Sequence, residues 1–256
     1  MPPAPDLRDR ILTRALPAED NPFAELSASV RWEDVGKGRR GAVLTKVDAA
    51  GGVPLVRTTT RYATPAQRFR PVHERLAHRI QDVTGSPAAF DNALIETYTN
   101  AYATMGAHSD QALDLADGSI VAVYSCYENP DAGPPRKLVF EPKEPGAGGF
   151  ELPLAHHTVV AFSVDTNRLL RHRIVLEEAG RAAENQWLGV TFRTSKTTLR
   201  FRDGHAHLPQ GARLTLADEE QRGAFYRLRR RENQETDFRY PSLTCTVSES
   251  DLMPPD

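Results

Sequence analysis

From about residue 90 onward, the chain consists of short runs that are rich in β-branched and aromatic residues. Turn-forming segments rich in Gly, Pro, Asn and Asp separate these runs, as in residues 129–135 and 145–149. Short strands in close succession predict a β-sandwich or an open barrel, so we expect a mostly β protein with flanking helices (α+β). The expected strands cover residues 93–98, 119–127, 137–141, 158–163, 173–176 and 187–192.

A long amphipathic helix is predicted before this β-rich part. Pro65 is a suitable first residue, and Gly85 lies just past the expected end, about twenty residues later. Apolar residues recur at helical spacing between them, which predicts that one face packs outside the strands. These apolar residues are Phe69, Val72, Leu76, Ile80 and Val83.

Two further helices are expected near the ends of the chain. Asp6 is a suitable cap for a short helix over residues 7–16. From about residue 217 the pattern is helical again, and Leu216, Phe225 and Leu228 would form its buried stripe. The predicted organisation is an N-terminal extension packed on the core (1–54), the core itself (55–200), and a C-terminal helix and arm (201–256).

The composition excludes several classes of protein. The 256 residues hold 32 Lys and Arg against 34 Asp and Glu, so the whole chain is not a basic nucleic-acid binder. Two cysteines, Cys126 and Cys245, cannot make a disulfide framework. The sequence contains no apolar run near the ~20 residues of a membrane span, and its N-terminus lacks a signal-peptide pattern. We expect a cytoplasmic monomer with no membrane contact.

The pair His108 and Asp110, followed far downstream by His172, predicts a metal site. On a strand, residues two apart point to the same face, so His108 and Asp110 can reach one ion. Two imidazoles and one carboxylate form the facial triad of Fe(II) oxygenases, which leaves positions for a co-substrate and O₂. Three protein ligands plus water also describe a catalytic zinc site, so zinc remains the alternative. The other histidines are expected in turns, on the long helix, or in a loop.

The surrounding motifs resemble those of a known family. The segments LIETYTNAYATMGAHSD, VVAFSVDTNRLLRHRIV and QWLGVTFRTS are similar to the three core motifs of the AlkB-like 2-oxoglutarate/Fe(II)-dependent dioxygenases. The resemblance covers roughly residues 55–200. It implies a double-stranded β-helix, or jelly roll, with the long helix packed outside. It also implies Fe(II), 2-oxoglutarate as co-substrate, and O₂.

The resemblance implies a role for each matching residue. His108, Asp110 and His172 would bind the iron, Tyr98 would hydrogen-bond 2-oxoglutarate, and Arg193 would bind one of its carboxylates. The chain departs from the family pattern at three positions. Glu96 stands where the family has Asn, Trp187 where it has a second clamping Arg, and Gly189 where it has another Asn. The cations that we consider as replacements for the missing arginine are Arg173, Lys196 and Arg200.

The same resemblance implies hydroxylation of a C–H bond, including oxidative N-demethylation of a nucleobase. The segment from Arg57 through Arg61 to Tyr62 falls where the family places a lid over a flipped base, and Tyr62 can stack on such a base. Basic residues cluster within residues 57–79 and 227–231, which suits single-stranded or damaged nucleic acid, although solvated helix faces explain them equally. A hydroxylase of a small molecule or protein side chain is the main alternative. A non-catalytic, metal-binding β-barrel module is the other.

Overall fold

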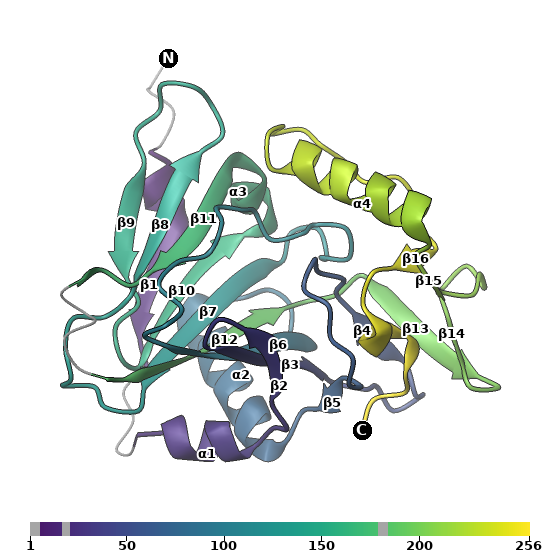
Figure 1. The fold of residues 1–256 in the computed structure, drawn as a ribbon, viewed down its shortest axis with the longest axis horizontal. Helices are drawn as coiled ribbons and strands as arrows, with labels where there is room; N and C mark the ends of the chain where they lie inside the picture. Colours follow the sequence, from purple (N-terminus) through teal and green to yellow (C-terminus); the bar gives the residue numbers. More distant parts are fainter. Residues whose placement is uncertain (1–5, 17–20, 179–183) are drawn as a thin grey trace.

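The computed structural model describes residues 6–16, 21–178 and 184–256 (Figure 1). Most of its regular structure is antiparallel β-sheet, and the large sheet has the order β1-β10-β7-β12-β6-β3-β2. Its strands are β1 (Ile11–Ala15), β10 (Thr158–Ser163), β7 (Ile120–Tyr127), β12 (Gln186–Arg193), β6 (Asn92–Thr99), β3 (Arg39–Thr45) and β2 (Glu33–Gly36), with β5 (Gln67–Arg68) parallel to β3.

A smaller sheet faces the large one. It has the order β11-β8-β9, formed by β11 (Leu170–Val175), β8 (Lys137–Pro142) and β9 (Phe150–Pro153). Isolated bridges from Thr104 to Val175 and from His108 to His172 extend this sheet with the segment that follows β6. From β6 to β12 the chain therefore passes back and forth between the two sheets, with β8 and β9 consecutive in the smaller one, which is the arrangement of a double-stranded β-helix. The predicted mostly β, jelly-roll fold is confirmed.

The core lies on both faces of the large sheet because strand side chains alternate. On β7, Val121 and Val123 point between the two sheets, where they meet Phe140 of β8 and Phe162 of β10. Tyr124, on the same strand, points to the opposite face. Side chains thus fill part of the space between the two sheets. The rest of this space is a cavity that side chains line.

Two helices, α1 (Phe23–Ala28) and α2 (Pro71–Thr84), cover the outer face of the large sheet (Figure 1). The expected start of the long helix at Pro65 is wrong. Gln67 and Arg68 pair with β3 as β5, and this backbone pairing delays the helix until Pro71. The expected end is right: Gly85 has φ +65°, which a glycine adopts without strain.

The N-terminal helix expected over residues 7–16 is also wrong. A short 3-10 helix, η1 (Leu7–Arg10), is followed by β1, which pairs with β10 along its whole length. An open sheet edge offers backbone hydrogen bonds that outweigh a weak local helix preference. The absence of a signal peptide was inferred partly from residues 1–5, which lie outside the described residues. Within the described residues, no helix is long and apolar enough to cross a membrane.

The C-terminal part adds two small sheets and a helix. Strand β13 (Thr197–Arg202) pairs with β14 (His205–His207) and with β4 (Val53–Leu55), and β15 (Thr215–Leu216) pairs with β16 (Cys245–Thr246). The predicted helix is present as α4 (Glu219–Glu232), followed by η3 (Glu249–Leu252). The buried stripe predicted for α4 is right at Phe225, whereas Leu216 precedes the helix and is 44% exposed and Leu228 is half-buried. The other buried residues of α4 are Arg229 and Glu232.

Candidate metal centre

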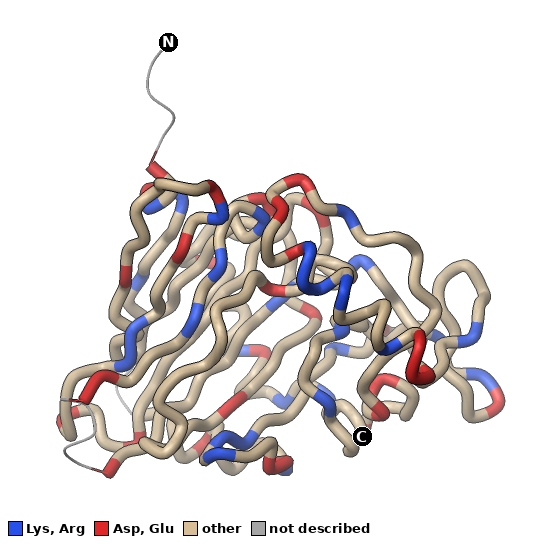
Figure 2. Tube along the Cα trace, turned by 45° about the horizontal axis from the view of Figure 1, so that its top comes forward, with Lys and Arg blue, Asp and Glu red and all other residues tan. Residues whose placement is uncertain are grey.

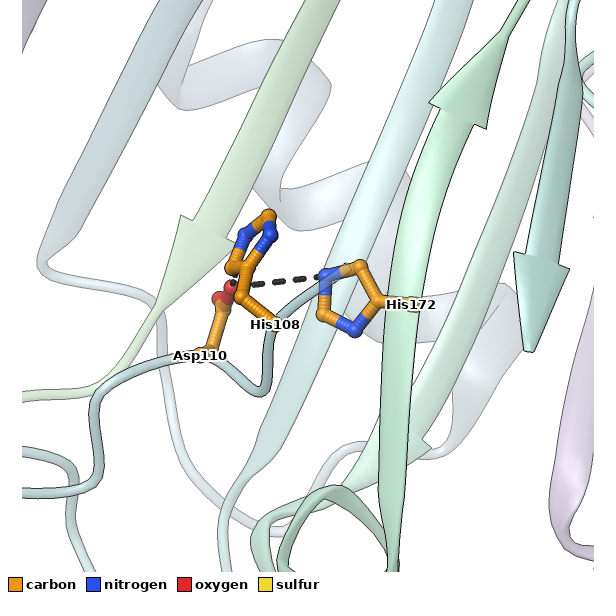
Figure 3. A group of neighbouring side chains, drawn as sticks. All are labelled: His108, Asp110 and His172. Carbon is orange, nitrogen blue, oxygen red and sulfur yellow. Dashed lines mark ion pairs between the residues drawn. The ribbon is translucent and has the colours of Figure 1, made fainter. Parts of the chain in front are cut away.

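His108, Asp110 and His172 converge between the two sheets (Figure 3). His108 and His172 begin from paired backbone positions, since His108 N donates to His172 O at 2.9 Å and His172 N donates to His108 O at 2.7 Å. Asp110 Oδ1 lies 3.6 Å from His172 Nε2 and 4.0 Å from His108 Nε2. Among the described residues, this is the group of metal-ligating side chains that could hold one ion.

Both nitrogens of His108 have defined environments. Its Nδ1 lies 2.9 Å from the carbonyl oxygen of Gly106, which leaves Nε2 with its lone pair toward Asp110 and His172. Burial is the main cause of a lowered pKa of about 3 for His108, and the neighbouring His172 and Arg229 contribute to the same shift. The imidazole is therefore neutral at physiological pH, as metal ligation requires.

Asp110 is held in one orientation by Arg193. Arg193 Nε and Nη2 both reach Asp110 Oδ2, at 2.8 and 2.7 Å. Burial raises the pKa of Asp110, but the opposing effects of Arg193 and His172 hold it well below its usual range. Because Oδ2 is engaged by the guanidinium, Oδ1 is the oxygen that faces the two imidazoles.

The backbone of the segment that carries His108 and Asp110 is fixed by a side chain of helix α3 (Val164–Leu169). Asn167, 1% exposed, accepts a hydrogen bond from Asp110 N through Oδ1 at 2.7 Å and donates from Nδ2 to Asp110 O at 2.7 Å. Ser109 Oγ donates to Leu170 O at 2.7 Å. The turn that carries Asp110 is thus tied to the start of β11, the strand that carries His172.

The end of α4 holds the same segment from the other side. Glu232 Oε1 accepts from Ala112 N at 2.8 Å, and Asn233 Oδ1 accepts from Ser109 N at 3.0 Å. Arg229 donates to Ser109 O and to Glu232. Residues of the C-terminal part of the chain therefore hold the backbone beside the candidate metal ligands. No local pattern in the sequence indicated this role.

The three candidate ligands line a cavity of about 390 Å³. Its walls contain both aliphatic side chains and arginines. The aliphatic residues are Val56, Leu94, Val123, Leu138 and Ile174, and the arginines are Arg39, Arg57, Arg193 and Arg229. The cavity is large enough for a small organic ligand beside a metal ion.

Tyr98 lies inside the fold but does not line this cavity. Its hydroxyl donates to Glu96 Oε2 at 2.8 Å, and its ring packs against Trp187 with centroids 4.7 Å apart. Glu96, two residues earlier on the same strand, does line the cavity and is bound there by Arg39. Arg39 was not singled out from the sequence, because it lies on β3, outside the matching motifs.

The cations considered as replacements for the missing arginine lie elsewhere. Arg173 pairs with Glu141 of β8, and Arg200 approaches Asp48 at 3.9 Å. Lys196 lines a second cavity of about 280 Å³ between β13 and the C-terminal arm. Trp187 occupies the expected arginine position, and its indole lies over Gly189, where a Cβ would clash with the ring.

The residues expected to form a lid over a base are placed as follows. Arg57 pairs with Asp114 and donates to the carbonyls of Leu243 and Cys245, so its guanidinium is bound within the protein. Tyr62 is 2% exposed, with its ring close to Gly41. Arg61 is exposed but borders a third cavity, which also includes Tyr62 and Arg222. Of these residues, Arg57 lines the cavity that His108, Asp110 and His172 also line.

The basic segment of α4 is divided between the interior and the surface. Arg229 is buried against Glu232, whereas Arg231 pairs with Glu235 on the surface. Figure 2 shows Lys and Arg positions interleaved with Asp and Glu positions along the trace. This pattern suits a solvated surface as well as it suits a polyanion partner.

The fold and the cluster together define a jelly-roll protein with a candidate 2-His-1-carboxylate metal site. No protein-family model matches the sequence, and no curated protein matches it. Among solved structures, OsALKBH1 is similar: the match covers 64% of this chain and 83% of that chain, with 12% sequence identity and a TM-score of 0.43. The functional argument therefore depends on the geometry of the site.

Proposed function

We propose that this protein is a mononuclear non-haem iron oxygenase that uses a 2-oxo acid as co-substrate and hydroxylates a C–H bond. The observation that carries the proposal is the convergence of two imidazole Nε2 atoms and one carboxylate oxygen, from His108, His172 and Asp110, on one cavity. Nitrogen and oxygen donors in this ratio suit Fe(II), and three protein ligands leave coordination positions for other groups. The donor set therefore fits the metal.

Iron would supply the activation of O₂, and the 2-oxo acid would supply two electrons. One oxygen atom enters the substrate as a hydroxyl group, and the other enters the carboxylate that remains when the 2-oxo acid loses CO₂. The protein's own residues bind and orient these groups. Arg193 orients Asp110, Asn167 fixes the backbone of Asp110, and the aliphatic walls limit the access of water.

The 2-oxoglutarate expected from the sequence is the first co-substrate to consider, and a methylated nucleobase is the first substrate. Hydroxylation of an N-methyl carbon would release formaldehyde and the demethylated amine. A hydroxylase of a small molecule or protein side chain is the second candidate. The contacts of Arg57 and Tyr62 within the protein favour this second candidate, because neither side chain is free to cover a flipped base.

The test is an anaerobic titration with Fe(II), followed by addition of a 2-oxo acid and observation of the visible charge-transfer band of the chelate. We expect one Fe(II) per chain and a band, both lost in Asp110→Asn. The matched control is His205→Asn, which removes a histidine exposed on β14. Retention of the band in Asp110→Asn would move the site elsewhere. Binding of Zn(II) with no band from any 2-oxo acid would favour the non-catalytic metal-binding module.

A further inference from the structure

Glu96 places a carboxylate of the protein itself in the wall of the metal cavity. The residue lies on β6 and is 6% exposed. Its Oε1 accepts from Arg39 Nε at 2.6 Å and also contacts Arg39 Nη2, and its Oε2 accepts from Tyr98 at 2.8 Å. Both oxygens of this carboxylate thus have charge-assisted or hydroxyl donors, which is the environment that a bound carboxylate ligand would need.

Arg39 makes other contacts in addition to Glu96. Its Nη2 lies 3.2 Å from Thr60 Oγ1, and its guanidinium lies 5.9 Å from the centre of the Tyr102 ring. These contacts fix the guanidinium beside Glu96. A second carboxylate brought to Arg39 would meet a cation that is already neutralised.

The remaining arginines of the cavity are paired in the same way. Arg57 Nη2 lies 2.8 Å from Asp114 Oδ1, Arg193 binds Asp110, and Arg229 binds Glu232. Every arginine among the described residues that line this cavity therefore has an internal carboxylate partner. The cavity has no lysine in its described lining. The second, distal carboxylate of a bound dicarboxylate would find no unpaired arginine or lysine in this lining.

Part of the remaining lining is aliphatic, beside uncharged polar side chains such as those of Gln111 and Thr191. Leu94, Val123 and Leu138 line the cavity from β6, β7 and β8, and Ile174 lines it from β11. On β12, Trp187 stands at the position of the expected arginine, but its indole covers Gly189 and does not line the cavity, so this position adds no cation to the lining. Its Nε1 donates to Ser125 Oγ at 3.2 Å rather than into the cavity.

We propose that Glu96 sets the co-substrate specificity: the site takes a 2-oxo acid whose distal end is uncharged and aliphatic, and it rejects a dicarboxylate such as 2-oxoglutarate. The inference depends on the proposed function, and it replaces 2-oxoglutarate with a monocarboxylate of the same chemical class. A distal carboxylate must lie beside Glu96, where like charges repel, or displace it and leave a buried, unpaired charge. Either arrangement costs free energy that an aliphatic end does not.

The test compares 2-oxoglutarate with 2-oxopentanoate, which has the same five-carbon chain without the distal carboxylate. Each acid is titrated into the Fe(II)-loaded protein under anaerobic conditions, and the charge-transfer band of the chelate is measured. We expect 2-oxopentanoate to bind at least about tenfold more tightly, a difference of about 1.4 kcal/mol. In Glu96→Gln, which preserves shape and removes the charge, the affinity for 2-oxoglutarate should rise at least about tenfold.

Two controls accompany this comparison. Glu151→Gln neutralises an exposed carboxylate on β9, and it should leave both affinities unchanged. The double variant Arg39→Gln/Glu96→Gln keeps the pair neutral, so it also covers the case in which Glu96→Gln fails to fold. It should still bind 2-oxopentanoate but gain no affinity for 2-oxoglutarate, because the cation is removed together with the carboxylate.

The outcomes separate the two proposals. Tighter binding of 2-oxoglutarate than of 2-oxopentanoate by the unmodified protein would overturn the role of Glu96 and leave the oxygenase proposal intact. The same holds if a folded Glu96→Gln protein shows unchanged affinity for 2-oxoglutarate, or if the double variant gains as much as the single one. If Fe(II) binds but neither acid produces a band, the proposed function fails together with the inference.

Discussion

Arg193 forms a two-contact ion pair with Asp110, from Nε at 2.8 Å and from Nη2 at 2.7 Å, both to Oδ2. The contact joins the last residue of β12 to the carboxylate of the candidate metal site. It pairs Arg193 with Asp110, whereas the sequence resemblance implied that this arginine would bind a carboxylate of the co-substrate. The role as a co-substrate clamp stays a prediction, and the role in orienting Asp110 can be tested separately.

Arg193→Ala should weaken metal binding by about 10–100-fold, because outer partners that orient a ligand typically contribute that much. Arg193→Lys keeps the charge but loses the planar fork, and it should recover part of the affinity. The dissociation constant for Co(II), followed by its visible absorption, measures the effect. Arg200→Ala, at an exposed arginine of β13, is the matched control. Unchanged Co(II) affinity in Arg193→Ala, together with lost binding of 2-oxo acids, would restore the clamp role.

Asn167 makes two hydrogen bonds to the backbone of Asp110, both 2.7 Å long and both buried. Asn167→Ala would leave a buried N–H and a buried C=O without this partner, so we expect the free energy of unfolding to fall by about 2–4 kcal/mol. Co(II) affinity should fall as well, since the Asp110 turn loses its anchor. Urea unfolding and Co(II) titration measure the two effects. Asn185→Ala, which removes an exposed side chain that bonds Asn129, should change neither Co(II) affinity nor stability by a comparable amount.

The cluster of His108, Asp110 and His172 was predictable from the sequence because its signal is local or follows from strand pairing. His108 and Asp110 are two positions apart in the sequence, and a closed β-fold brings a later strand opposite this pair. The residues that support the ligands had no such signal. Asn167 acts on a backbone 57 residues away, and Arg229 on one 120 residues away. Contacts of this kind depend on how α3 and α4 are placed by the completed fold.

The errors in secondary structure have a common physical origin. The expected helix over residues 7–16 and the expected helix start at Pro65 both failed where an open strand edge was nearby. Residues 11–15 pair with β10, and Gln67 pairs with Leu44 of β3. Local helix preference contributes only tenths of a kcal/mol per residue, so tertiary hydrogen bonding decides such segments. The departure at Glu96 was visible in the sequence, but its meaning depended on Arg39, which lies on another strand.

Glu232 connects α4 to the segment that carries His108 and Asp110, and its removal should destabilise the protein strongly. Its carboxylate accepts from Ala112 N, from Arg229 and from the hydroxyl of Tyr240, the last at 2.6 Å. Glu232→Ala leaves Arg229 buried and uncompensated, so we expect a loss of about 3–5 kcal/mol. Glu235→Ala is the matched control, because Glu235 pairs with Arg231 on the surface, where solvent screens such pairs and they contribute little to stability. Similar losses in both variants, measured by urea unfolding, would contradict a special role for Glu232.

His73 should make the stability of the protein dependent on pH. Its ring is fully buried in the first turn of α2, where Nδ1 accepts from Arg70 N at 3.0 Å and Nε2 lies 2.7 Å from Ser29 Oγ. The pKa of His73 is lowered to about 4, mainly by burial and also by the positive charge of Arg70, while Glu25 acts in the opposite direction. Both ring nitrogens are satisfied in the neutral form, and protonation would place a second donor against Arg70 N.

The sign of the effect follows from the unfolded state, in which a histidine titrates near pH 6.5. Between about pH 6.5 and pH 4 the unfolded chain binds the proton and the folded chain does not, so stability falls as the pH falls. The shift corresponds to about 3 kcal/mol, present in full above pH 6.5. His73→Asn keeps an acceptor near Nδ1 without a titrating ring, and it should reduce the loss of unfolding free energy between pH 7.5 and pH 4.5. His78→Asn, an exposed position on the same helix, should preserve that loss. If the free energy of unfolding depended on pH identically in the unmodified protein and in His73→Asn, the pKa of His73 would be the same in the folded and the unfolded chain, against this prediction.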